Sequence, residues 1–203
     1  MNYRHIYHAG NFADVMKHAI LAWVVESLTR KDKPFFALDT HAGIGAYDLG
    51  DGAALKTGEA EAGIRRVLAA AAAGAPPALA PYLRVLRAMN PDGGCRHYPG
   101  SPELTLRLMR ERDRLALVEL HPEDHASLRR RYGRDRRVGV HHLDGHVAAK
   151  GLLPPPERRG LVLIDPPFEQ RDEFQRLGRT LARMRRLWPV SYTHLAGDSQ
   201  MTL

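Results

Sequence analysis

Residues 161–168 have the sequence Leu-Val-Leu-Ile-Asp-Pro-Pro-Phe, and this stretch contains the pattern that decides the fold. Four aliphatic residues in a row predict a short strand buried on both faces, and the acidic residue and prolines after them predict its end. The same pattern, a short apolar run leading to an acidic residue, occurs three more times along the chain. These runs cover 35–38, 115–118 and 138–143, and they lead to Asp39, Glu119 and Asp144.

Helical patterns lie between these runs. Apolar residues recur at helical spacing over 12–30, with Asn11 as the N-cap and Asp14 in the first turn. Ser101 and Pro102 predict a further helix start with Ser101 as N-cap, and helices are also expected after Pro122 and over 172–187. Strands that alternate with helices predict an α/β fold, a parallel sheet with helices on both faces. The apolar set of the first helix comprises Phe12, Val15, Met16, Ala19, Ile20, Trp23, Val24 and Leu28.

Residues 46–100 interrupt this alternation. They show helical patterns near 58–73 and 78–89, a Pro76-Pro77 break and a turn at 90–94, with no visible strand pattern. We therefore expect a small helical insertion there.

Composition narrows the class of protein. The chain has 203 residues, of which 44% are hydrophobic, so one domain with a sizeable core is expected. No apolar run approaches the roughly 20 residues that cross a bilayer, and the first residues lack a signal core, so we expect no membrane association and a cytoplasmic location. A single cysteine, Cys95, excludes an internal disulfide and a multi-cysteine metal site. The histidines and aspartates of 3–18 match no familiar zinc spacing, and no metal is expected.

The chain is basic, with a formal net charge of +7. Such a charge favours a polyanionic partner. Its densest basic cluster indicates either a nucleic-acid surface or a solvated helix end, and the sequence does not choose between them. This cluster consists of Arg129, Arg130, Arg131, Arg134, Arg136 and Arg137.

Acidic residues at the ends of parallel strands are expected along one edge of the sheet, where ligands of open α/β sheets bind. Glu119 could accept hydrogen bonds from both hydroxyls of a ribose, and Asp144 from an adenine amino group, with Gly145 leaving room for the ring. The alternative for Glu119 is an exposed acidic residue at a strand end, and the alternative for Asp144 and Gly145 is an ordinary Asp-Gly turn. The turn from Asp39 to Gly45 lacks the G-x-G-x-x-G pattern of dinucleotide-binding folds. An acid before the glycines fits the nucleoside-binding turn of S-adenosylmethionine methyltransferases better.

The D-P-P-F sequence at 165–168 is typical of methyltransferases that act on amino groups. An exocyclic amine is a poor nucleophile because its lone pair is delocalised into the ring. The Asp165 carboxylate and the Pro166 carbonyl could each accept one of its N–H groups, which frees the lone pair for attack on a methyl sulfonium. Phe168 offers a face on which an extruded base stacks. The alternative is a structural Pro-Pro loop with a buried phenylalanine.

Six motifs, in order along the chain, resemble the RlmJ family of bacterial 23S ribosomal RNA adenine-N6 methyltransferases. They are Y-R-H-x-x-H-A-G-N-x-A-D-V-x-K-H at 3–18, L-D-T-H-A-G at 38–43, Y-P-G-S-P at 98–102, E-L-H-P at 119–122, D-G at 144–145 and L-I-D-P-P-F at 163–168. The resemblance implies a Rossmann-like fold that binds S-adenosylmethionine, with Asp165 as the proton acceptor. It also places Tyr3 and Lys17 near the substrate adenosine, and Phe168 stands where the family usually has tyrosine. The implied cofactor-binding residues are His18, His41, Ser101, Glu119, Asp144, Gly145 and Asp165.

The family pattern continues to about Trp188-Pro189. We therefore expect a methyltransferase domain over 1–189, with the insertion at 46–100, and a non-family tail at 190–203 that is artefactual or disordered. The remaining strands of the family's sheet are expected to be missing.

These observations lead to a functional hypothesis. We expect methyl transfer from S-adenosylmethionine to the N6 amine of an adenine in 23S ribosomal RNA, with no obligate protein partner. The alternatives are a DNA adenine-N6 or cytosine-N4 methyltransferase, and an inactive, truncated nucleic-acid-binding domain.

Overall fold

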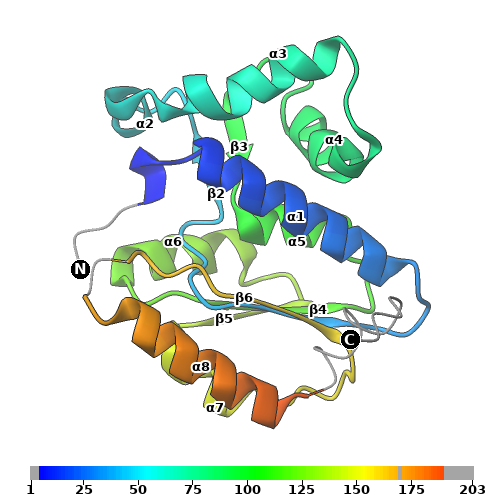
Figure 1. Cartoon of the computed structure of the whole chain (residues 1–203), viewed down its shortest axis with the longest axis vertical. Helices are drawn as coiled ribbons and strands as arrows, with labels where there is room; N and C mark the ends of the chain where they lie inside the picture. Colours follow the sequence, from blue (N-terminus) through cyan, green and yellow to red (C-terminus); the bar gives the residue numbers. More distant parts are fainter. Residues whose placement is uncertain (1–4, 169–170, 190–203) are drawn as a thin grey trace, which may run out of the picture. The chain divides into compact units, whose positions relative to one another are not determined.

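A computed structural model of the chain describes residues 5–168 and 171–189, which form two compact units (Figure 1). The helical unit contains the described residues up to Asp32 together with Ala42–Glu111. The sheet unit contains Lys33–His41 and the described residues from Arg112 onward.

Four parallel strands form the sheet unit, and they are the four that the apolar runs predict. They are β1 (Phe36–Asp39), β4 (Arg114–Val118), β5 (Val138–His141) and β6 (Gly160–Leu163), in the order β5-β4-β1-β6. The register places Leu38 of β1 opposite Ala116 of β4 and Val162 of β6. The predicted α/β fold with a parallel sheet is confirmed.

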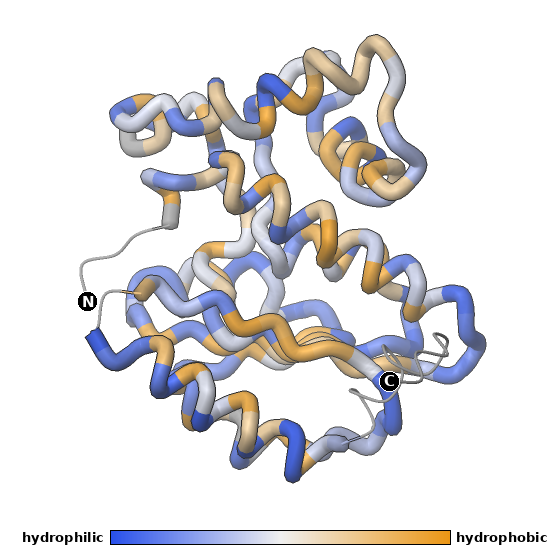
Figure 2. The backbone as a smooth tube through the Cα atoms, viewed as in Figure 1, coloured by the Kyte–Doolittle hydropathy of each residue, from blue (hydrophilic) through white to orange (hydrophobic). Residues whose placement is uncertain are grey.

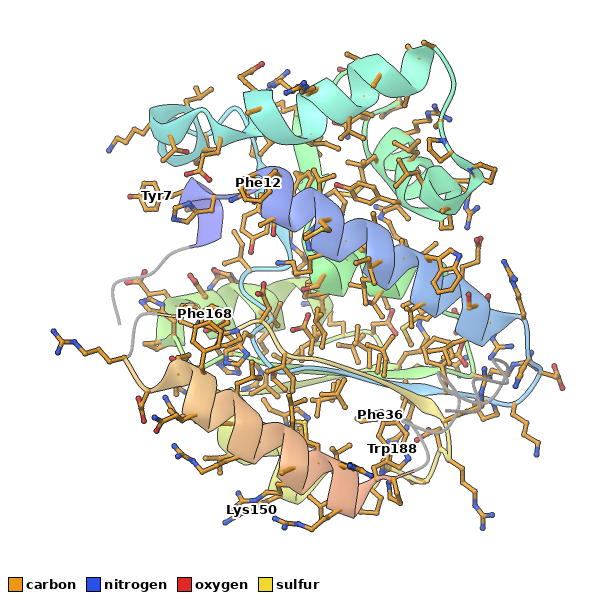
Figure 3. The ribbon with its side chains drawn as sticks, in the orientation of Figure 1. Tyr7, Phe12, Phe36, Lys150, Phe168 and Trp188 are labelled. Carbon is orange, nitrogen blue, oxygen red and sulfur yellow. The ribbon has the colours of Figure 1, made fainter. Side chains whose placement is uncertain are left out.

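Helices cover both faces of this sheet. The helix α6 (Pro122–Tyr132) lies on one face, and α7 (Gly145–Leu152) and α8 (Glu173–Leu187) lie together on the other (Figure 1). The rings of Phe36 and Trp188 meet on the α7–α8 face, with their centroids 6.2 Å apart (Figure 3). Apolar residues are concentrated in the strands of the sheet (Figure 2). The core on this face is made of Phe36, Leu38, Ala116, Val118, Ala148, Leu153, Met184 and Trp188.

The helical unit contains a pair of strands that the sequence did not reveal. The antiparallel strands β2 and β3 pair Tyr47 with Tyr98, so the expectation of no strand within 46–100 is wrong. Each strand has only three residues, and its partner lies about 50 residues away, so no alternation long enough to predict a strand exists. The elements of this unit are η1 (His5–Tyr7), α1 (Phe12–Thr29), β2 (Ala46–Asp48), α2 (Gly52–Thr57), η2 (Glu61–Arg65), α3 (Arg66–Ala72), η3 (Pro77–Leu79), α4 (Ala80–Met89), β3 (His97–Pro99) and α5 (Ser101–Leu108).

The helix α1 begins at the predicted residue and ends one residue before the predicted bound of 30, but it buries a different face. The Asn11 side chain accepts a hydrogen bond from the Asp14 amide over 2.9 Å, which confirms the N-cap. The most regular apolar stripe is nevertheless exposed, with exposed fractions of 74% for Phe12, 62% for Met16, 59% for Ile20 and 48% for Trp23. None of the eight apolar residues that predict the helix is buried. The buried residues are Asp14, His18, Leu21, Ala22 and Val25.

Polar residues reach the buried face of α1 because other groups of the unit bind them. The Asp14 carboxylate accepts a hydrogen bond from the Gly10 amide and pairs with Lys17 Nζ at 2.8 Å. The ring of His18 bonds to the phenol oxygen of Tyr98 at 2.9 Å. Periodicity identified the helix, but it could not show that polar residues with such partners would be buried. The N-cap of α5 also differs from the predicted residue. Gly100 is the N-cap of this helix, and Ser101 is its first residue.

Candidate active site

Four acidic residues stand at the carboxyl ends of the four parallel strands. Asp39 ends β1, Glu119 follows β4, and Asp144 and Asp165 follow β5 and β6 within three residues of the strand. Because the strands are parallel and ordered β5-β4-β1-β6, these residues share one edge of the sheet in the order Asp144, Glu119, Asp39, Asp165. The structure therefore gathers the predicted carboxylates where an α/β sheet binds its ligand.

Glu119 is held by the backbone on both sides of its strand end. Its amide donates to the His141 carbonyl of β5 over 3.1 Å, and its Oε1 accepts from the His121 amide over 2.8 Å. The side chain is buried, with an exposed fraction of 8%. A carboxylate fixed in this way has a defined direction, and its oxygens can accept further hydrogen bonds from a diol.

Asp144 immediately precedes the helix α7. Its Oδ1 accepts from the His146 amide at 2.8 Å, and its Oδ2 accepts from Arg176 Nη2 at 3.1 Å. Each carboxylate oxygen has a second lone pair, so Asp144 can still accept from an amino group. A Cβ atom on the next residue, Gly145, would overlap the carbonyl oxygen of Thr40. Glycine is therefore required for the close approach of α7 to the end of β1.

His41 follows β1 and faces this edge of the sheet. Its Nδ1 lies 2.8 Å from the Thr40 hydroxyl, and its ring meets that of His146 edge-on with centroids 5.5 Å apart. Burial, followed by the nearby His146, lowers the pKa of His41 to about 4, although Asp165 and Asp144 partly oppose the shift. The ring is therefore neutral near pH 7 and can offer a hydrogen bond without bringing a positive charge.

A buried polar network, which sequence reasoning missed, supports these residues. The two ring nitrogens of His146 bond to Glu173 Oε1 at 2.8 Å and to Thr180 Oγ1 at 2.9 Å. Glu173 and Thr180 lie seven residues apart on one face of α8, and both are buried. Arg176, one turn after Glu173, reaches Asp144. The spacing of Glu173, Arg176 and Thr180 along one helix was the only sequence signal for this network. It can be interpreted only once α7 is known to pack on α8.

The D-P-P-F turn leaves the sheet with its aromatic ring exposed. Phe168 has a positive φ of 53° and an exposed fraction of 46%, whereas Pro166 is buried (Figure 3). A non-glycine residue in this region costs on the order of 1–3 kcal/mol and persists where its surroundings enforce it, often at functional sites. The alternative of a structural loop around a buried phenylalanine does not hold for Phe168.

Three further predicted residues belong to the helical unit. His18 is buried beside Tyr98, Lys17 is paired with Asp14, and Ser101 is buried at the start of α5. Desolvation is the main cause that raises the pKa of Tyr98. The sheet unit brings together the other predicted residues, apart from Tyr3, which lies outside the described residues. These are His41, Glu119, Asp144, Gly145, Asp165, Pro166 and Phe168.

The described residues bear on two expectations, which concern a metal site and a membrane-spanning helix. Over residues 5–168 and 171–189, no group of three or more histidine, cysteine, aspartate or glutamate side chains could hold a metal ion. Within the same ranges no helix is long and apolar enough to cross a membrane.

Comparison with known proteins identifies the family. Residues 32–193 match the family model described as ribosomal RNA large subunit methyltransferase D, RlmJ. The chain belongs to the RlmJ family. Ribosomal RNA large subunit methyltransferase J of Escherichia coli K12 is 47% identical over 175 residues, and that of Haemophilus influenzae Rd is 43% identical over 175 residues.

The RlmJ relatives are longer than this chain. Each alignment covers 86% of the chain but 62% of the relative, so the chain spans less than two thirds of their length. A crystal structure of a protein from Legionella pneumophila Philadelphia 1 superposes with a TM-score of 0.83 at 39% identity, over 90% of this chain and 66% of that one. The resemblance to a Rossmann-like methyltransferase is thus confirmed at the level of family and fold.

Proposed function

We propose that the chain carries out methyl transfer from S-adenosylmethionine to the N6 amine of an adenine in 23S ribosomal RNA. Family membership supports methyl transfer to ribosomal RNA, because the relatives are named for this activity. The observation that carries the finer proposal is the D-P-P-F turn, with its exposed Phe168, at the same sheet edge as Glu119 and Asp144.

The sheet edge fits the proposed cofactor. Glu119 presents a fixed carboxylate to which ribose hydroxyls could donate, and Asp144 retains acceptor capacity for an adenine amino group. Gly145 allows α7 to approach the end of β1, beside the neutral ring of His41. When bound, S-adenosylmethionine supplies a methyl group made electrophilic by its sulfonium. The resemblance further assigns His18 and Ser101 to the cofactor and Lys17 and Tyr3 to the substrate, and these assignments stay predictions.

The residues of the turn have separate tasks in the proposed reaction. The Asp165 carboxylate accepts one N–H of the adenine amine, and the Pro166 carbonyl accepts the other. Both bonds pull the nitrogen from planarity, so that its lone pair becomes available and points at the methyl carbon. As the N–C bond forms, the bond between the methyl carbon and the sulfonium sulfur would break, its electron pair would stay on sulfur as a neutral thioether, and the surplus proton would pass to the Asp165 carboxylate. Phe168 stacks on the base, which must leave its helix or loop to reach the turn.

Transfer of a radiolabelled methyl group tests the proposal. The acceptor is 23S ribosomal RNA from a strain that lacks the family's enzyme, the E. coli relative is the positive control, and the D165A variant is the negative control. We expect label in adenine N6 of the RNA with the wild-type chain and with the E. coli relative, and no label with D165A. Equal labelling of duplex DNA at the same salt concentration would favour a DNA methyltransferase, and no labelling of either polymer would reject the proposed function.

A further inference from the structure

The first turn of α8 exposes a second aromatic ring beside the D-P-P-F turn. Phe174 has an exposed fraction of 76%, and its ring centroid lies 5.0 Å from that of Phe168, with the ring planes tilted by 38°. Among the large hydrophobic residues described as exposed, Phe174 is the most exposed. The aromatic pair, defined here as Phe168 and Phe174, thus stands in solvent next to the proposed reaction centre.

Folding of the sheet unit does not explain this exposure. The residue before Phe174 is Glu173, which is buried and bonded to His146, so α8 already faces the sheet with a different side. Phe174 is absent from the core that α7 and α8 build on the sheet. Burial of a phenylalanine ring stabilises a fold, so an exposed pair of rings indicates a binding surface.

The charge around Phe174 favours a nucleic acid as the occupant. Residues 171–189 contain six arginines and two acidic residues, a net charge of +4, and within this segment Arg176 pairs with Asp144 and Arg179 with Asp172. Flat rings with arginines nearby bind single-stranded nucleic acid, since bases stack on the rings while the arginines neutralise phosphates. The exposed residues that flank the face of Phe174 on this helix, Gln175 and Arg179, are polar, and the exposed apolar side chain on the same face, Leu181, lies two turns away.

We propose that Phe174 is a base-stacking residue that extends the site of Phe168 along a single-stranded RNA segment. This inference rests on the proposed function, because it takes the D-P-P-F turn as the place where the target base arrives. Phe168 receives the target adenine, and Phe174 stacks on that base or on its neighbour in the strand. In the absence of RNA the two rings cover each other, which shields part of both from water.

Binding of a fluorescent RNA tests Phe174 without requiring methyl transfer. The probe is a short single-stranded RNA of uridines with one central adenine, made in three versions with 2-aminopurine at the adenine or at either neighbour. Stacking on an aromatic ring quenches 2-aminopurine. We expect the wild-type chain to quench at least one version, and F174A to lose quenching there and bind at least about fivefold more weakly, because a stacked base contributes about 1–3 kcal/mol.

Matched variants separate stacking from general apolar contact. F174W should retain affinity and quenching, whereas F174L, which keeps the apolar character, should behave like F174A. Leu181 lies on the same helix and is also exposed, so L181A is the control and should stay within about twofold of wild type. Unchanged affinity and quenching in F174A, or an equal loss in L181A, would overturn the assignment. RNA binding with the expected losses but without methyl transfer would reject the proposed function alone.

Discussion

Asp165 stands just beyond β6, half-buried and outside the apolar core of the sheet unit. Removing its carboxylate therefore leaves no cavity in the core, so D165A should keep its melting temperature within a few degrees. The same change removes the acceptor that aligns the amine and takes its proton, and acid–base groups contribute about 10²–10⁴-fold to a rate. We expect near-complete loss of methyl transfer in the labelling assay.

The isosteric variant sharpens this prediction. The amide oxygen of D165N can still accept a hydrogen bond from the amine, although it is a poor proton acceptor, so D165N should retain more activity than D165A. Thermal unfolding followed by circular dichroism provides the control for folding. If D165A unfolds the chain, or if it transfers methyl groups at nearly the wild-type rate, the D-P-P-F turn has a structural role only.

His41 should make the stability of the sheet unit depend on pH. Its pKa is lowered from 6.5 to about 4, so between these values the unfolded chain binds a proton at His41 that the folded chain does not. The unfolded state then binds more protons, and stability falls as the pH drops from 6.5 towards 4. At 1.36 kcal/mol for each pKa unit, the loss approaches about 3 kcal/mol.

Urea unfolding at pH 7 and pH 4.5 measures this effect. H41Q cannot titrate at this position and is the matched control, because the carboxylates elsewhere titrate in both proteins. The wild type should lose more unfolding free energy between the two pH values than H41Q does. An equal loss in the two proteins would show that His41 is not held neutral by burial.

The elements could be predicted from the sequence to different degrees. Four apolar runs that end in acidic residues are a local signal, and β1, β4, β5 and β6 were found from them. The pairing of Tyr47 with Tyr98 is non-local, and strands of three residues carry too little alternation to be recognised. In the site, Asp165 and Glu119 could be found because their chemistry follows from residue type and strand position. The contact of His146 with Glu173 depends on how α7 packs on α8, which no local pattern encodes.

The two faces of α1 give a prediction at the scale of one helix. Ile20 is exposed and Leu21, the next residue, is buried at 5% exposure. L21A removes buried methylene and methyl groups and should lower the free energy of unfolding by about 2–5 kcal/mol. I20A removes atoms that face solvent and should change it by less than about 0.5 kcal/mol.

Denaturant unfolding of the two variants tests which face of α1 is buried in the helical unit. Comparable losses in I20A and L21A would mean that the stripe of Phe12, Met16, Ile20 and Trp23 is packed in solution. That result would contradict the burial of Leu21 and the exposure of Ile20. It would show that the buried face of α1 is the one that periodicity alone predicts.

At the scale of the whole molecule, the net charge of +7 makes binding of RNA sensitive to salt. The arginine cluster of α6 offers the most concentrated positive surface. Arg129 and Arg131 are exposed in the last turn of the helix, whereas Arg137 is paired with Asp135 at 2.7 Å. We expect R129Q/R131Q to lower the slope of log K against log salt concentration by about 0.7 for each lost contact with a single-stranded phosphate, and hence by about 1.4 in total.

A solvated helix end would behave differently, and that difference decides between the two interpretations of the cluster. Arginines that only complement the helix dipole contribute about 0.3–1 kcal/mol to stability, so their loss would lower the melting temperature and leave the salt slope unchanged. The charge-matched control is R66Q/R87Q, which removes two exposed arginines from α3 and α4. If the control reduces the slope as much as R129Q/R131Q does, only the net charge matters and the α6 cluster is not a binding surface. A reduced slope in R129Q/R131Q alone would place RNA phosphates at α6, because counterion release depends on the number of phosphates that are neutralised.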